Sequence, residues 1–179
     1  MDKSTLLSQL EDSRKKYKPE VIKTVIIAEA PPDSIERFFY YEDVKTADFL
    51  FLGIVEVLYP EAKKKYLEYK RHTQIKEIIL KQLQIDGYFL LDLFELPISL
   101  NSDNEIQAVS KLTKKLEKIC DSETPVILIK ANVFDIAYKP LKLKFNVMNK
   151  RIEFPSCGNQ LKFQTKFSEL IKQIERQIG

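Results

Sequence analysis

The sequence is poor in the residues that build metal and cofactor sites. Among its 179 residues are two cysteines, one histidine and four glycines. The histidine, His72, and the cysteines, Cys120 and Cys157, form no C-x-x-C motif, so one chain supplies neither a Cys/His zinc site nor a four-cysteine iron–sulfur cluster. The glycines are too scattered for a G-x-G-x-x-G or Walker A loop, which excludes the usual dinucleotide and nucleoside-triphosphate cradles. We therefore expect no metal and no cofactor.

Long apolar runs are also lacking. The longest is well short of the ~18 residues that span a bilayer, and the first residues do not begin an apolar signal segment. We therefore expect a cytoplasmic protein that makes no membrane contact and whose two thiols are free. Lys and Arg number 29 against 26 Asp and Glu, a net charge of +3. This mild excess permits a nucleic-acid partner without requiring one.

What the chain does contain is enough apolar sequence for one folded domain over residues 1–179, since 44% of its residues are hydrophobic. Short apolar, β-branched runs alternate with longer segments of helical spacing. This alternation predicts a three-layer α/β domain, with a four-stranded, mostly parallel sheet flanked by helices. The expected strands are 21–28, 88–93, 125–130 and 144–148.

The expected helices follow from apolar spacing and from residues that begin or end helices. The first, 4–17, belongs to an N-terminal segment 1–20 that packs on the domain. Ser102 and Glu105 have the spacing of a capping box at the start of a helix that runs to residue 119, and Gly87 is expected near the end of a long helix. The other expected helices are 47–58, 61–83, 131–138 and 159–178.

The ends of the predicted strands carry the candidate functional residues. Ligands of open parallel sheets bind at the carboxyl ends of the strands, so residues that follow the strands should gather at one edge. That edge would combine carboxylates, cations and aromatic rings, which suits the stacking of a base and the binding of a phosphate. The residues are Glu29, Phe38 and Phe39 after the first strand, Asp92 at the end of the second, Lys130 at the end of the third, and Arg151 and Ser156 after the fourth.

Three segments at these positions resemble motifs of the uracil-DNA glycosylase superfamily. Val25–Pro32 resembles the first motif of the branch whose strand runs into Gly-Glu-Ala-Pro-Gly. Leu90–Asp92 resembles the Leu-Leu-Asn motif, whose Asn reads the uracil edge. Phe154–Ser156 resembles the late His-Pro-Ser motif before the final helix. The order and the strand-end positions match over most of the chain, from Val21 to the C-terminus.

The resemblance implies a uracil-DNA glycosylase-like fold and a site in which a flipped base lies on an aromatic face and is read along its edge. Glu29 would be the catalytic residue, in contact with a water or the sugar. Asp92 would read the base, and Phe38 or Phe39 would stack on it. Lys130, Arg151 and Ser156 would hold backbone phosphates.

Three departures from the family pattern bear on activity. Phe154 stands where the family has its late His, Asp92 stands where it has the base-reading Asn, and Ala30 stands where its most active branch has a water-positioning Asp. They predict a domain that binds a nucleobase or DNA with weak, altered or lost N-glycosylase activity. The alternative is a non-catalytic α/β module that binds a small ligand or a protein partner. The oligomeric state is left open.

Each candidate residue also has an ordinary structural interpretation. Glu29 could pair with a lysine, and Asp92, which lies in an apolar run, could belong to a buried ion pair. The aromatic residues could be core, and the turn 154–159 could be a plain strand-to-helix connection. His72 and the basic runs 14–16 and 63–65 are interpreted as solvated helix faces, and Cys157 lacks a neighbouring histidine that would make it catalytic.

Overall fold

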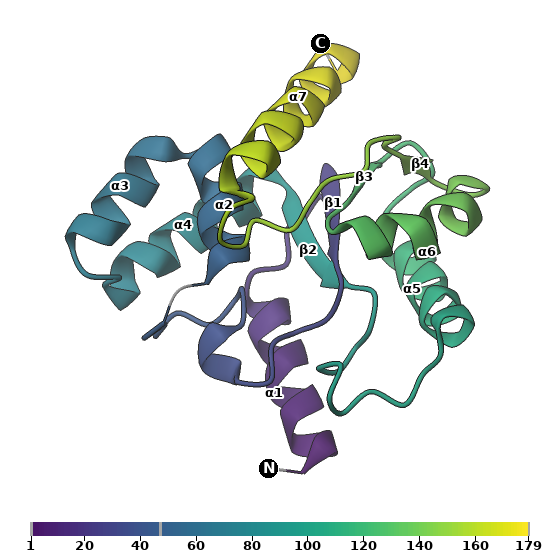
Figure 1. Ribbon diagram of the computed structural model, residues 1–179, viewed down its shortest axis with the longest axis horizontal. Helices are drawn as coiled ribbons and strands as arrows, with labels where there is room; N and C mark the ends of the chain where they lie inside the picture. The colour runs from purple at the N-terminus through teal and green to yellow at the C-terminus, as the bar shows by residue number, and fades with distance from the viewer. Residues whose placement is uncertain (1, 47, 179) are drawn as a thin grey trace.

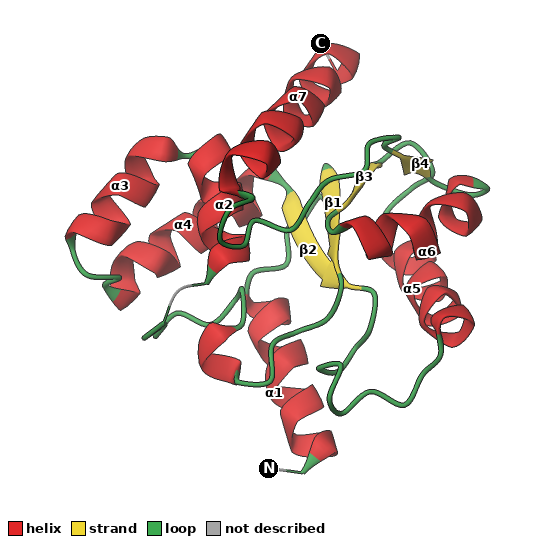
Figure 2. Cartoon of the chain, viewed as in Figure 1, coloured by secondary structure: helices red, strands yellow, loops and turns green. Residues whose placement is uncertain are grey.

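The computed structural model describes residues 2–46 and 48–178 and confirms the predicted α/β class. Its sheet has four parallel strands in the order β2–β1–β3–β4 (Figure 2). All five residues of β1 and all four of β3 are buried, as their β-branched sequences predict for the centre of a parallel sheet. The strands are β1 (Thr24–Ala28), β2 (Tyr88–Asp92), β3 (Pro125–Leu128) and β4 (Asn146–Val147).

Helices cover both faces of this sheet, which gives the three layers (Figure 1). The helices α2, α3, α4 and α7 lie on one side, and α5 and α6 lie on the other. None of the helices within residues 2–46 and 48–178 has a stretch long and apolar enough to cross a membrane. The helices are α1 (Lys3–Lys16), η1 (Ile35–Arg37), α2 (Phe49–Leu58), α3 (Pro60–Glu68), α4 (Thr73–Asp86), α5 (Glu105–Ile119), α6 (Ala131–Lys142) and α7 (Gln160–Ile178).

The predicted single helix 61–83 is wrong, because the chain breaks between α3 and α4. Lys70 and Arg71 take left-handed backbone angles, with φ of 50° and 60°. His72 then caps α4, since its Nδ1 accepts a hydrogen bond from the Gln74 amide at 3.3 Å. The break gives the two helices separate directions, so that residues of both, Tyr66 from α3 and Lys76 from α4, are fully buried.

The start of α5 and the end of α6 also differ from those predicted. The capping box of α5 is formed by Asn104 and Gln107 rather than by Ser102 and Glu105. The Asn104 side chain accepts from the Gln107 amide, and the Gln107 side chain accepts from the Asn104 amide, both at 2.9 Å. Helix α6 continues past the expected end at 138 to Lys142, with Pro140 inside it. Gly87, with φ of 85°, is the predicted cap of α4.

The order of the strands fixes where a ligand would bind. From β1 the chain moves to β2 on one side, whereas β3 and then β4 lie on the other side of β1. The direction of winding therefore reverses between β1 and β3. In open parallel sheets, ligand sites lie outside the carboxyl ends of the strands at this reversal. In this protein Glu29 follows β1 and Lys130 lies two residues beyond β3.

Candidate ligand-binding site

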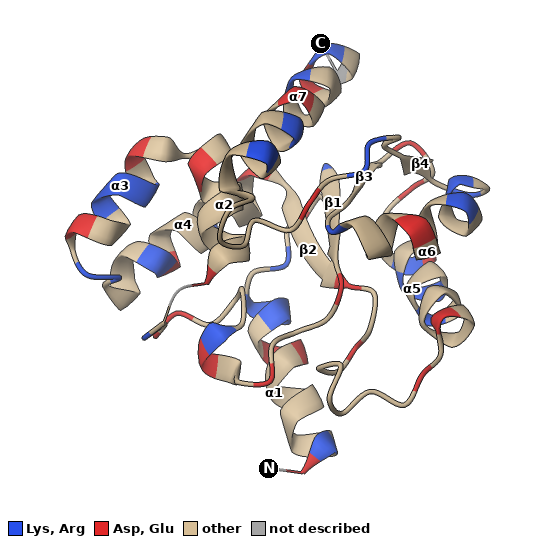
Figure 3. Ribbon diagram, in the orientation of Figure 1, with Lys and Arg blue, Asp and Glu red and all other residues tan. Residues whose placement is uncertain are grey.

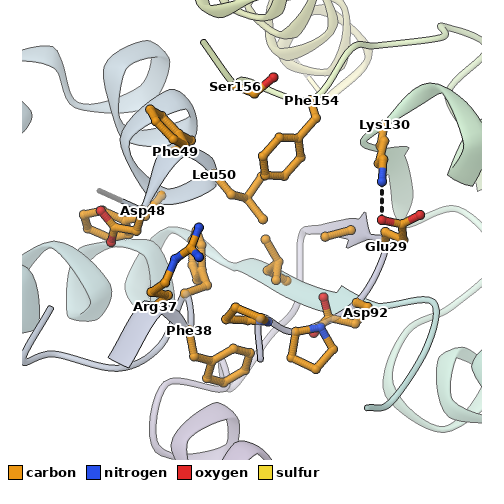
Figure 4. A pocket seen from close by; sticks show the side chains of 17 residues that line it. Glu29, Arg37, Phe38, Asp48, Phe49, Leu50, Asp92, Lys130, Phe154 and Ser156 are labelled. Carbon is orange, nitrogen blue, oxygen red and sulfur yellow. Dashed lines mark hydrogen bonds and ion pairs between the residues drawn. The ribbon is translucent and has the colours of Figure 1, made fainter. Parts of the chain in front are cut away.

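A cavity of about 480 Å³ lies at the carboxyl ends of β1 and β2, within the size range of small-molecule sites (Figure 4). Its walls come from the segments that follow β1, from the start of α2, and from the turn before α7. It brings together six of the seven predicted site residues and leaves out Arg151. The six are Glu29, Phe38, Phe39, Asp92, Lys130 and Ser156.

Aromatic and aliphatic side chains form most of the cavity wall. Phe38 and Phe39 are only 1% and 6% exposed, and their rings pack edge-on against Tyr40. Phe49 and Phe154 are half-buried, so they retain accessible surface. Figure 4 shows the Phe154 ring extending into the cavity toward Leu50. The faces open to a ligand therefore belong to Phe49 and Phe154 more than to the predicted pair.

Phe49 and Leu50 were not predicted as site residues. In the sequence they begin an almost continuous apolar run, which reads as a buried helix. In the structure they occupy the first turn of α2, directly after Asp48, and that turn faces the cavity. No signal in the sequence separates this first turn from the rest of the run.

Glu29 belongs to a polar cluster at the winding reversal. Its carboxylate accepts hydrogen bonds from the Lys130 ammonium and from the Asn132 amide, and all three side chains are partly exposed. Glu29 therefore does pair with a lysine, as its ordinary structural interpretation predicted. Lys130 has φ of 85° and ψ of 135°, a backbone conformation that strongly favours glycine. Asn132, which was not among the seven predicted site residues, is in the first turn of α6.

Asp92 is held in a buried ion pair with the N-terminal helix. Its Oδ2 accepts a hydrogen bond from Arg14 at 2.8 Å, and each side chain is 4% exposed. The Arg14 guanidinium also lies 5.4 Å from the centre of the Phe38 ring. Burial raises the pKa of the Asp92 carboxyl, and the Arg14 charge opposes that shift. The predicted base-reading residue thus has one oxygen engaged by the protein.

A second buried pair contains Asp48, a residue of the cavity wall. Asp48 accepts a hydrogen bond from Lys76 of α4 at 2.9 Å, and both side chains are at most 2% exposed. The Lys76 ammonium lies 4.4 Å from the centre of the Phe51 ring, a cation–π contact. Burial lowers the pKa of Lys76, and the Asp48 charge opposes this. The pair anchors the start of α2, where Phe49 is exposed to the cavity.

The two remaining predicted phosphate-binding residues have different surroundings. Arg151 donates two hydrogen bonds to Asp135, at 2.8 and 3.0 Å, and it is not among the cavity residues. Ser156 lies at the cavity beside Phe154 (Figure 4). Within its turn, the amides of Ser156, Gly158 and Asn159 donate to Phe154, Gln160 and Ser156. This turn therefore offers the Ser156 hydroxyl rather than a row of open amides.

The described part of the chain holds no group of three or more His, Cys, Asp or Glu side chains placed to bind a metal ion. Cys120 and Cys157 are both free, and Cys157 is exposed. Chemically, the cavity offers aromatic faces, a hydroxyl and paired charges, a combination that suits a planar ligand with polar edges.

Comparison of the chain with models of protein families, with curated proteins and with solved structures finds no match.

Proposed function

We propose that this protein binds a nucleobase, carried by a nucleotide or a nucleic-acid strand, in the cavity at the carboxyl ends of β1 and β2. The observation that carries the proposal is the meeting of Phe49 and Phe154 with the Glu29–Lys130 pair in one cavity at this edge of the sheet. Aromatic faces bind bases of any sequence by stacking, at about 1–3 kcal/mol per base. Polar groups beside them would fix the base in one orientation.

The contacts in this cavity favour the prediction that N-glycosylase activity is weak or absent. Glu29 is already bound to Lys130 and Asn132, and Asp92 is bound to Arg14. Phe154 offers no hydrogen-bond donor, and a positioned donor to a developing anion is worth about 10²–10³ in rate. Binding without rapid hydrolysis is therefore the function that these contacts support.

A second candidate function is a non-catalytic module for a small ligand other than a base. The observation that favours it is the pairing of each strand-end carboxylate with a cation of the chain, which leaves no carboxylate poised to activate water. A ligand that binds tightly without being a base or a nucleotide would favour this candidate.

The test combines a binding and a cleavage measurement. Isothermal titration calorimetry with the four deoxynucleosides should show binding by the wild type, and Phe154→Ala should weaken it about tenfold through loss of stacking. Tyr69→Ala removes an aromatic side chain that is 60% exposed and lies outside the cavity, and it should leave binding unchanged.

A strand-nicking assay on uracil-containing DNA gives the second measurement, for which we expect little or no cleavage by the wild type. Absence of binding to every deoxynucleoside and to every deoxynucleoside 5′-monophosphate would reject the proposal. Rapid uracil excision would show instead that the protein is an active glycosylase and that its catalytic groups have been misassigned.

A further inference from the structure

The charged side chains of the cavity wall differ in whether they have a partner of opposite charge. Each of the three carboxylates contacts a cation, and none is left unpaired. The pairs are Glu29 with Lys130, Asp92 with Arg14, and Asp48 with Lys76. The remaining charged residue of the wall is Arg37.

Arg37 has no ion pair and no side-chain hydrogen bond with any residue that the structure describes, and it is exposed. It ends the short helix η1, whose backbone is fixed by the bond from the Arg37 amide to the Ser34 carbonyl at 3.0 Å. In Figure 4 its guanidinium points toward the cavity, in the direction of Leu50, rather than away into solvent. An arginine in this position presents its donors at the cavity without a protein acceptor.

An arginine fork matches the geometry of a phosphate, to which it donates two parallel hydrogen bonds. The predicted phosphate ligands Lys130 and Arg151 are both engaged by carboxylates. Arg37 is the residue that can take their role without breaking an existing pair.

We infer that Arg37 binds a phosphate of the ligand, so that the cavity takes a nucleotide rather than a free base. The inference rests on the proposed function. It identifies the residue that binds the phosphate of a ligand whose base occupies the same cavity. The phosphate belongs either to a free mononucleotide or to a nucleic-acid strand, and the experiment below separates these two sources.

The experiment compares Arg37→Gln with the wild type by calorimetry, using the four deoxynucleosides, their 5′-monophosphates and a single strand of about ten nucleotides. Arg176→Gln is the matched control, since it removes the same charge from an exposed residue of α7 outside the cavity. We expect a phosphorylated probe to bind the wild type about tenfold or more tightly than the deoxynucleoside, because a charge-assisted hydrogen bond contributes that much. Arg37→Gln should remove this advantage and leave deoxynucleoside binding unchanged, and Arg176→Gln should behave as the wild type.

Each outcome has a distinct meaning. If the monophosphate shows the advantage, the ligand is a free nucleotide, and if only the strand shows it, the phosphate belongs to a nucleic acid; both support the inference. If deoxynucleosides and phosphorylated probes bind equally, or if Arg37→Gln weakens both alike, the role of Arg37 is rejected while base binding stands. If no probe binds, the proposed function itself is rejected.

Discussion

At the scale of single residues, buried charge pairs determine which side chains at the cavity are available to a ligand. Arg14 and Lys76 come from helices outside the cavity and contact carboxylates in its wall. Removing one member of a buried pair leaves an uncompensated charge, which costs far more than the net stabilisation that the pair provides. The stability of this protein should therefore depend strongly on these two cations.

Arg14→Met should lower the free energy of unfolding by about 3–5 kcal/mol near neutral pH, because Asp92 is left charged and buried. It should also raise the pKa of Asp92 further, since the opposing positive charge is lost. A carboxyl with a higher pKa in the folded state than in the unfolded chain binds its proton more readily when folded. Lowering the pH through that pKa therefore stabilises the folded state relative to the unfolded one.

The measurement is urea unfolding of wild type and Arg14→Met at about pH 7 and about pH 5, where the deficit of the variant should shrink as Asp92 becomes protonated. Arg151→Met is the control, because Arg151 and Asp135 form an exposed pair whose loss should change little. A deficit that is equal at both pH values would mean that lost packing, not the charge of Asp92, destabilises the variant.

Backbone strain at Lys130 gives a second prediction. Its φ of 85° and ψ of 135° cost a side-chain-bearing residue about 1–3 kcal/mol. Lys130→Gly should therefore be more stable than Lys130→Ala by about 1 kcal/mol or more, by thermal or chemical unfolding. The reverse order is expected at Lys114, an exposed residue inside α5, where alanine should be better than glycine by about 1 kcal/mol. The same order at both positions would contradict strain at Lys130.

At the scale of elements, the contact between α2 and α7 holds the two sides of the cavity together. Both helices bring apolar faces to this contact. Because α2 has one charged residue, Figure 3 draws it almost entirely in tan. The helices approach closely at Gly53. A Cβ there would lie 2.8 Å from the Pro155 Cβ and 3.1 Å from a ring carbon of Phe163. Pro155 in turn is the neighbour of Phe154 in the cavity.

Gly53→Ala should therefore destabilise the protein, although alanine normally stabilises a helix by about 1 kcal/mol relative to glycine. Overpacking against Pro155 costs about 1–3 kcal/mol, for a net loss of up to about 2 kcal/mol. The displaced Phe154 should also weaken nucleoside binding. Unfolding and calorimetry test both effects, with Ser110→Ala on the exposed face of α5 as a control that should be neutral or slightly stabilising. If Gly53→Ala is more stable than the wild type and binds nucleosides normally, then Pro155 and Phe163 can shift to accommodate the added methyl group without measurable cost.

At the scale of the whole molecule, charge governs any binding to nucleic acid. The net charge is only +3, and acidic and basic residues are mixed along the helices in Figure 3. Such a distribution predicts few phosphate contacts and therefore a modest affinity for nucleic acid. Tight binding through the phosphate backbone alone is not expected.

We expect weak binding to single-stranded DNA whose affinity decreases as the salt concentration rises, measured by fluorescence anisotropy of a labelled strand. Each phosphate contact contributes about −0.7 to the slope of log affinity against log salt concentration. Arg37→Gln should reduce the magnitude of the slope by about 0.7, and Arg176→Gln should not. Absence of binding at low salt would favour a free nucleotide or another small ligand over a strand.

The sequence alone determined the fold class, the positions of the four strands along the chain, and the edge of the sheet at which six of the seven predicted site residues lie. Runs such as Val25–Ile27 are apolar and β-branched over lengths that suit a buried strand. In the structure this run lies in β1, all of whose residues are buried. Because the carboxyl ends of parallel strands share one edge, Glu29, Asp92 and Lys130 could be expected close together before any coordinates were known.

Only the tertiary structure decided which partners these residues have. The pairing of Arg14 with Asp92 joins positions 78 residues apart, and no periodicity along the chain encodes such a contact. The helix break at Lys70 and Arg71 likewise has no glycine or proline that would predict it from the sequence. With this break, Tyr66 of α3 and Lys76 of α4 both lie fully buried. Arg37 was no candidate in the sequence, since a surface arginine becomes notable only when every other charge around a cavity is paired.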